Sequence, residues 1–231
     1  LSTAESKAFH TAAAQCLYLA VRVRPDILCA VSFLCTRVKS PTQQDWKKLE
    51  HLFRYLRETK HLGIKIGGGP DGCIQLAGYV DASFGVHIDG KSHTGMMITL
   101  GRGPVLCKSL KQRIVAKSSA EAELIGTSDI ASLLAWEQQF LSEQGYRKEV
   151  YPASLHEDNT SAMHLAQNGR PNSDRTRHIK LRYFFVKQYL DNGSFRMIHC
   201  PTNVMIADIL TKPLQGETFA RLRDLLLGYA V

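Results

Sequence analysis

Residues 74–83 restrict the fold of this chain most, because they alternate like a half-buried strand and end beside a carboxylate. Ile74, Leu76 and Val80 have one parity, and Asp81 has the other. Successive side chains of a strand point to opposite faces, so Asp81 lies on one definite face of the sheet. We expect that face to carry the function.

Three later acids, Glu123, Asp158 and Asp208, are predicted to return to Asp81 and to hold divalent metal with it. Asp158 follows a predicted strand, where an aspartate is often only the N-cap of a helix, so its position alone leaves both readings open. Asp208 stands between apolar neighbours, which solubility does not explain. Four clustered carboxylates cannot all ionise without compensation, and their oxygen ligands select Mg²⁺ or Mn²⁺.

Two glutamates, Glu121 and Glu123, open the next helix and cannot face the same way. Ser118 starts a capping box in which Glu121 reaches back to the Ser118 amide, and the helix is expected to run to about residue 145. On a helical wheel Glu123 lies about 50° from the centre of the apolar arc, whereas Glu121 lies about 110° away. A first-turn glutamate often only complements the helix dipole, but one on the buried face needs a partner. The wheel therefore predicts that Glu121 caps the helix while Glu123 points at the sheet.

The chain divides at the glycine-rich residues 67–72. Across residues 1–66 apolar residues recur every three or four positions, with breaks at 24–26 and 40–42, where proline suits the first turn of a new helix. The second part begins as a meander of three strands and continues with alternating helices and strands. The segments expected there are strands 74–83, 94–100 and 104–110, a helix from 118 to about 145, strand 151–156, helix 161–167, a helix with Leu181, Phe184, Phe185 and Tyr189 on its apolar side, strand 195–200, a helix carrying 207–210, and an amphipathic helix within 213–231.

The net charge of +8 over 231 residues favours polyanions, although many basic proteins have no nucleic-acid role. The positive residues gather in two stretches, one along the predicted third strand and one before the helix that carries Leu181. Each stretch has two possible explanations: it is a solvated surface, or it contacts phosphates. The residues nominated for nucleic-acid contact are Lys111, Arg113 and Lys117 in the first stretch and Arg175, Arg177 and His178 in the second.

The six cysteines stand in apolar surroundings and never form a C-x-x-C pair, so zinc is not expected. We interpret them as buried free thiols of a reducing compartment. No apolar run reaches the ~18 residues of a membrane span, and no charged start with an apolar signal core opens the chain. We therefore expect an intracellular, soluble protein.

Several short runs carry a resemblance to a known family. The runs in the second part are K-S-S-A-E-A-E-L at 117–124, D-N at 158–159, R-H-I at 177–179 with R-Y at 182–183, and A-D-I-L-T-K-P-L at 207–214. Together they closely resemble the ribonuclease H portion of copia-type (Ty1/copia) LTR retrotransposon polyproteins. The runs C-L-Y-L-A at 16–20, R-P-D-I at 24–27 and R-Y-L at 54–56 resemble the end of the reverse transcriptase just upstream.

The resemblance implies an α/β, ribonuclease H-like fold, with a mixed five-stranded sheet in the order 3-2-1-4-5 flanked by helices and preceded by a small helical segment. Residues 1–66 would be the helical C-terminal part of the reverse transcriptase, of the thumb or connection kind. A linker at 67–72, a ribonuclease H domain at 73–212 and an amphipathic helix at 213–231 would follow.

The resemblance also implies a two-metal endoribonuclease that hydrolyses the RNA strand of RNA/DNA hybrids during retrotransposon reverse transcription. The carboxylates that stand where this family places its catalytic and Mg²⁺-binding residues are Asp81, Glu123, Asp158 and Asp208. Ser118, Ser119 and Asn159 are the candidates for contacting 2′-hydroxyl groups. The implied partners are the hybrid and the upstream polymerase domain of the same polyprotein, without a membrane or a small-molecule cofactor. The implied location is the cytoplasm, within a virus-like particle, or the nucleus.

Two features depart from the family pattern. The paired-aspartate motif of the polymerase is absent from the sequence, so the chain is not expected to polymerise DNA. No Gly-His-rich loop of the kind in cellular ribonucleases H precedes Asp208, and His199, the nearest histidine, is expected in the fifth strand.

Two rival functions stay open from the sequence. One is an inactive or domesticated module that binds nucleic acid through its basic surface, and the other is a DNA nuclease or recombinase of the same fold. Retention of all four acids argues against the first, and the transposon-like runs argue against the second.

Overall fold

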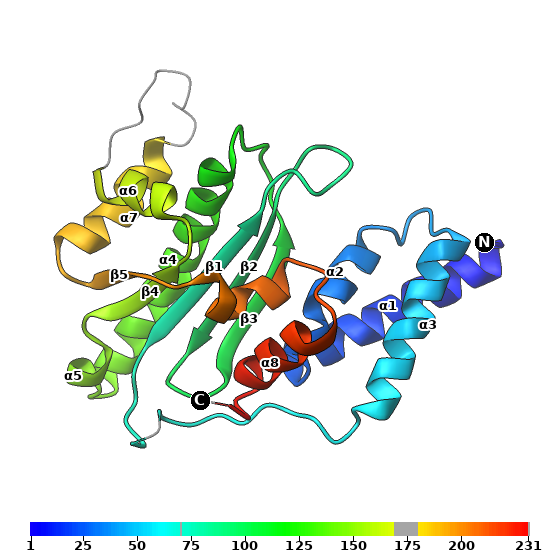
Figure 1. Cartoon of the computed structure of the whole chain (residues 1–231), viewed down its shortest axis with the longest axis horizontal. Helices are drawn as coiled ribbons and strands as arrows, with labels where there is room; N and C mark the ends of the chain where they lie inside the picture. The colour runs from blue at the N-terminus through cyan, green and yellow to red at the C-terminus, as the bar shows by residue number, and fades with distance from the viewer. Residues whose placement is uncertain (70, 169–179, 231) are drawn as a thin grey trace.

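The computed structural model describes residues 1–69, 71–168 and 180–230 of the chain. Its strands are β1 Ala77–Ser83, β2 His93–Thr99, β3 Pro104–Lys111, β4 Ala153–Glu157 and β5 Phe195–His199. They form one sheet in the order β3-β2-β1-β4-β5 (Figure 1). β1–β2 and β2–β3 are antiparallel, whereas β1–β4 and β4–β5 are parallel. The predicted ribonuclease H-like sheet is confirmed in both order and mixed direction.

Helices α4 (Ser119–Glu143) and α7 (Lys180–Asp191) cover one face of the sheet. Leu76, Val80 and Met96 are buried against them, as the alternation along residues 74–83 predicts for the first two. Burial of this apolar surface is the main force that holds helices and sheet together. Two shorter helices on the same side in Figure 1 are α5 Arg147–Val150 and α6 Thr160–Asn168.

The N-terminal helices and the last helix cover the opposite face (Figure 1). They are α1 Thr3–Arg22, the 3-10 helix η1 Pro25–Ile27, α2 Leu28–Cys35, α3 Gln43–Glu58 and α8 Gly216–Leu226. One core cluster joins Phe9 of α1, Met97 of β2 and Leu226 of α8. The helices before residues 67–72 thus pack directly on the sheet that follows, and the division of the chain into domains at that segment stays a prediction.

The two proline breaks among these helices lie where the sequence predicts them. Pro25 is the first residue of η1, and Thr42, directly after the second proline, is the N-cap of α3. Beside the first break, Arg24 and Asp26 form a buried ion pair of 2.8 Å, and the Tyr55 hydroxyl on α3 donates to Asp26 at 2.6 Å. Because each buried charge has a partner, this network joins the turn after α1 and η1 to α3 without leaving an uncompensated charge.

Two predictions of core positions are wrong. Leu181 and Phe184 of α7 are 82% and 55% exposed, and Tyr183 and Val186 face the core instead. Residues 183–186 are apolar or aromatic throughout, so periodicity could not select the buried face. On α3 the spacing of Trp46 and Phe53 on one helix face predicts that both are core residues. Trp46 packs against the core, whereas Phe53 is 45% exposed.

Two further expectations concern the thiols and the membrane. All six cysteines are free, but Cys73 is exposed, whereas burial was predicted for it with the rest. Within the described part of the chain, no helix combines the length and the apolar character needed to cross a membrane.

Candidate metal centre

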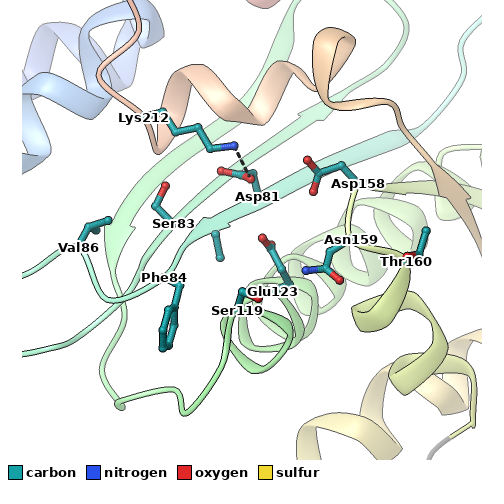
Figure 2. A pocket seen from close by; sticks show the side chains of 11 residues that line it. Asp81, Ser83, Phe84, Val86, Ser119, Glu123, Asp158, Asn159, Thr160 and Lys212 are labelled. Carbon is teal, nitrogen blue, oxygen red and sulfur yellow. Dashed lines mark hydrogen bonds and ion pairs between the residues drawn. The ribbon is translucent and has the colours of Figure 1, made fainter.

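Three of the four predicted acids meet at one edge of the sheet. Asp81 lies near the end of β1 and Asp158 directly follows β4, and because these strands are parallel neighbours their carboxyl ends lie together. Glu123 comes from the N-terminal part of α4, which packs on β1. One carboxylate oxygen from each acid lies within 4.8 Å of the other two. Figure 2 shows the three side chains converging.

The start of α4 separates the roles of its two glutamates. The Ser118 hydroxyl caps the helix by accepting from the Glu121 amide at 3.2 Å. The Glu121 carboxylate accepts from the Lys117 amide at 2.7 Å, one residue before the Ser118 amide that the capping box predicts. Glu123 lines a pocket together with Asp81 and Asp158, which we call the carboxylate pocket. Its buried Oε2 has no hydrogen-bond partner among the described residues. Burial, and then the neighbouring Glu157 and Asp81, raise the pKa of Glu123.

Asp208 joins the site through a lysine. It lies in the helical segment that was predicted for 207–210, which the structure shows to be η4 (Ile206–Leu210), a five-residue 3-10 helix. The Lys212 ammonium is 2.7 Å from Asp208 Oδ1 and 3.2 Å from Asp81 Oδ1, and the Thr211 hydroxyl donates to Asp81. Burial, followed by the Asp81 charge, raises the pKa of Asp208 to about 6. Burial alone would lower the pKa of Lys212, but the two aspartates outweigh it and raise that pKa. Lys212 is therefore the cation that holds these two acids.

Glu157, the last residue of β4, is a fifth acid that the sequence analysis missed. It is fully buried, and its carboxylate accepts from the Thr127 hydroxyl at 2.9 Å and from the Asn159 amide at 3.1 Å. Burial raises its pKa to about 8, and Asp158 and Asp81 add to this effect. Two consecutive acids at the end of a predicted strand were the available signal, because one of them must point to each face.

A pocket of about 630 Å³ opens over Asp81, Glu123 and Asp158. Its lining residues are Asp81, Ala82, Ser83, Phe84, Val86, Ser119, Glu123, Asp158, Asn159, Thr160 and Lys212. Of the three polar residues nominated for sugar contact, Ser119 and Asn159 lie in this wall and Ser118 caps α4. The Asn159 side-chain oxygen accepts from the Ala162 amide, so Asn159, and not Asp158, caps α6.

The nominated basic residues lie outside this pocket or outside the described residues. Lys111 and Arg113 line a second pocket of about 270 Å³ between the end of β3 and α4, and Lys111 is paired with Asp89 at 2.8 Å. Lys117 is exposed just before α4. Arg175, Arg177 and His178 lie in a segment that the structure does not describe. His199 is exposed at the end of β5, in the strand where it was predicted.

The donor set fits a hard divalent cation. The converging ligands are carboxylate oxygens, which Mg²⁺, Mn²⁺ and Ca²⁺ prefer. Their mutual repulsion and burial are costly, because among the described residues Lys212 is the only ion-pair partner of Asp81 and a buried Glu123 oxygen has no hydrogen-bond partner. A cation between Asp81, Glu123 and Asp158 would meet all of these requirements.

Comparison with known proteins gives relatives over most of the chain, although no family model matches it. The chain is 31% identical over 218 residues to the retrovirus-related Pol polyprotein from transposon TNT 1-94 of Nicotiana tabacum, covering 94% of this chain and 16% of the relative. It is 35% identical over 203 residues to the Pol polyprotein from transposon RE2 of Arabidopsis thaliana, covering 87% and 14%. The chain thus spans about one sixth of the length of these relatives.

Among solved structures, the ribonuclease H1 named LC11, isolated from compost, aligns with 59% of this chain and 92% of its own. Sequence identity is 15% and the TM-score is 0.43. The strand order of this chain, and not that weak likeness, is the basis for the fold described above.

Proposed function

The chain belongs to the Pol polyproteins of copia-type retrotransposons, and we propose that it is a ribonuclease H that cleaves the RNA strand of RNA/DNA hybrids during reverse transcription. The observation that carries the proposal is the convergence of Asp81, Glu123 and Asp158 in an open pocket, where the buried Glu123 Oε2 has no hydrogen-bond partner within the described part of the chain. Such an arrangement suits the hydrolysis of a phosphodiester, because carboxylates can hold divalent cations that stabilise the negative charge on the attacking and leaving oxygens.

Asp81, Glu123, Asp158 and Asp208 would hold two Mg²⁺ ions, or Mn²⁺ in their place. When bound, the ions supply a nucleophilic hydroxide at neutral pH and stabilise the leaving oxygen. Glu157 does not line the pocket. It supports the site from behind, because its carboxylate orients Asn159 by accepting from the Asn159 amide and is itself held by the Thr127 hydroxyl.

Two groups in the pocket wall have proposed roles in substrate contact. The Lys212 side chain is 35% exposed, so its ammonium can meet a phosphate while it stays close to Asp208. Ser119 and Asn159 lie across the pocket from Lys212 in Figure 2, where hydroxyl and amide groups can contact 2′-hydroxyls of the RNA strand.

The wider partners of the chain are also proposals. The hybrid would lie along Lys111, Arg113 and Lys117, together with Arg175, Arg177 and His178. Residues 1–66 would be the end of the reverse transcriptase, which joins this module to the polymerase domain of the same polyprotein. We also propose an intracellular location, either in the cytoplasm within a virus-like particle or in the nucleus.

The test is cleavage of four labelled substrates, an RNA/DNA hybrid, double-stranded RNA, duplex DNA and single-stranded RNA, with Mg²⁺ or with chelator. We expect cleavage of the hybrid alone, in its RNA strand, leaving 3′-hydroxyl and 5′-phosphate ends, and none with chelator. Binding of the hybrid without cleavage in Mg²⁺ or Mn²⁺ would favour the inactive nucleic-acid-binding module instead. Cleavage of duplex DNA would favour the DNA nuclease.

A further inference from the structure

A buried chain of hydrogen bonds lies on the same face of the sheet as Asp81. His93 of β2 is fully buried, and its Nε2 is 2.7 Å from the Ser109 hydroxyl of β3. Its Nδ1 is 3.0 Å from Nε2 of His87, which lies in the loop between β1 and β2. The Ser109 hydroxyl in turn lies 2.6 Å from the Leu210 carbonyl oxygen. None of these three side chains lines the carboxylate pocket.

In this series of hydrogen bonds, the donors and acceptors can be arranged in one direction only. Ser109 has a single hydroxyl hydrogen, and the Leu210 carbonyl can only accept, so that hydrogen is donated to Leu210. His93 must then donate from Nε2 to Ser109, and in its neutral form it accepts at Nδ1 from His87. Burial, and then the neighbouring His87, lower the pKa of His93 to about 4, which agrees with a neutral ring.

The hydrogen-bond chain ends on the segment that carries the fourth acid. Leu210 closes η4, two residues after Asp208 and directly before Thr211 and Lys212, both of which bond to Asp81. The η4 backbone lies tightly on β2, because a Cβ at Gly95 would be 2.6 Å from Leu210 Cβ and 2.8 Å from a backbone oxygen of η4.

A side chain of the N-terminal helices closes the other side of this hydrogen-bond chain. The Phe33 ring of α2 stacks on His87 and His93, with ring centroids 4.9 and 4.7 Å away. The imidazoles are thus held between α2 and the sheet, in one orientation.

We propose that His93 is a positioning residue for the carboxylate site: through Ser109 it fixes the Leu210 carbonyl, and with it the placement of Asp208, Thr211 and Lys212 against Asp81. This proposal rests on the proposed function only for its kinetic readout. His93 touches no carboxylate, so it acts through the backbone of η4. Groups that orient metal ligands in this indirect way typically change metal affinity or activity by about 10–100-fold when they are removed.

The experiment compares Ser109→Ala and His93→Asn with His93→Gln and with a matched control, Thr99→Val. Thr99 lies at the opposite end of β2, and its buried hydroxyl also donates to a carbonyl at 2.6 Å, that of Gly103. Glutamine can place its Nε2 where His93 has Nε2 and so restore the bond to Ser109, whereas asparagine is too short. Measurements on the full chain are Mn²⁺ affinity by titration, kcat and KM for hybrid cleavage, and thermal melting.

We expect Ser109→Ala and His93→Asn to weaken Mn²⁺ binding and to lower kcat by about tenfold or more, with KM changed by less than about twofold. His93→Gln should stay within about threefold of wild type, and Thr99→Val should change only the melting temperature. Nitrogen NMR of the metal-free protein should show His93 protonated at Nε2.

The proposal would be overturned if Ser109→Ala and His93→Asn had the same Mn²⁺ affinity and kcat as Thr99→Val. It would also be overturned if NMR showed His93 protonated at Nδ1. If His93→Asn does not fold, Ser109→Ala decides alone. A wild type that binds Mn²⁺ but does not cut the hybrid would refute the proposed function, while the Mn²⁺ affinities of the variants would still decide the role of His93.

Discussion

Two polar clusters contact the η4 segment, one through Asp208 and Lys212 and the other through the Leu210 carbonyl, and they differ in how well their hydrogen-bonding groups are satisfied. In the carboxylate site (Asp81, Glu123, Glu157, Asp158, Asp208 and Lys212), the pKa values of Glu123, Glu157 and Asp208 are raised, and a buried Glu123 oxygen has no hydrogen-bond partner among the described residues. In the histidine chain (His87, His93 and Ser109), each donor faces an acceptor and the pKa of both rings is lowered.

The difference indicates which cluster awaits a ligand. Unpaired buried polar atoms and crowded like charges are costly, and they persist where binding of another group offsets that cost. A satisfied buried network needs no ligand and makes the surrounding backbone rigid. The carboxylate site thus has the features of a binding site, and the histidine chain has those of its support.

The largest effect is expected where η4 meets the sheet. In Gly95→Ala the new Cβ would be 2.6 Å from Leu210 Cβ, so η4 must move away from β2 and carry Asp208 and Lys212 with it. We expect hybrid cleavage to fall by about a hundredfold or more, and the free energy of unfolding to fall by about 1–3 kcal/mol. The control is Gly63→Ala, because a Cβ there meets nothing within 4 Å. Equal activity of the two variants would show that η4 need not be fixed.

A smaller effect is expected from Lys212→Gln, which removes the cation from the carboxylate site. Asp81 and Asp208 then repel each other, so the metal-free protein should lose about 1–2 kcal/mol, a figure reduced because the Lys212 side chain is 35% exposed. The rise in melting temperature on adding Mg²⁺ should become larger than in wild type. Lys48→Gln, whose side chain is 70% exposed, is the control. If Mg²⁺ raises the melting temperature of Lys212→Gln and of wild type equally, then Lys212 and the metal do not neutralise the same carboxylates.

The two clusters should also give opposite pH dependence in the metal-free protein. The raised pKa values of Glu157, about 8, and Asp208, about 6, mean that the folded state holds protons that the unfolded state releases above about pH 4.5, so stability falls as pH rises through these values. The lowered pKa of His93, about 4, gives stability that is present above pH 6.5 and is lost as pH falls toward 4.

Thermal melting in chelator should therefore show decreasing stability from pH 6.5 to 8, by up to about 1.4 kcal/mol per pH unit for each retained proton. Mg²⁺ should reverse this trend, because it binds the deprotonated carboxylates. His93→Gln should flatten only the acidic side of the profile. A stability that rises from pH 6.5 to 8 without metal would contradict the raised carboxyl pKa values.

The smallest effect concerns the basic residues at the end of β3, Lys111 and Arg113, which line the second pocket. Arg113→Ala should weaken hybrid binding a few-fold without sequence preference and lower the salt slope by about one. Lys111→Ala should do less, because Lys111 is already paired with Asp89 at 2.8 Å. Fluorescence anisotropy over a salt series measures both. If neither variant changes the salt slope, Arg113 and Lys111 belong to a solvated surface and do not contact phosphates.

The sequence predicted the strands and the carboxylates that local patterns control. Alternation placed Asp81, and the helical wheel separated Glu123 from Glu121. Each of these conclusions depends on one element and its period.

The missed residues depend on contacts between elements. Lys212 stands two residues after η4, a short 3-10 helix that packs closely on Gly95 of β2, and its ammonium lies 3.2 Å from Asp81 Oδ1. His93 and Ser109 meet only through the antiparallel pairing of β2 and β3, in which Ser109 lies opposite Gly95. Neither the helix type of η4 nor that register can be read from spacing along the chain.

The most direct test of the central claim, that the carboxylate site requires a metal, is a Mg²⁺ titration of Glu123→Gln beside Glu121→Gln. Hybrid cleavage and thermal melting are followed at each Mg²⁺ concentration. Glu121→Gln should cost at most about 1 kcal/mol and keep most of the activity, because its carboxylate only caps α4. Glu123→Gln should melt no lower than wild type in chelator, gain little from Mg²⁺, and lose cleavage by about a hundredfold or more. An inactive Glu121→Gln beside an active, Mg²⁺-stabilised Glu123→Gln would contradict the account.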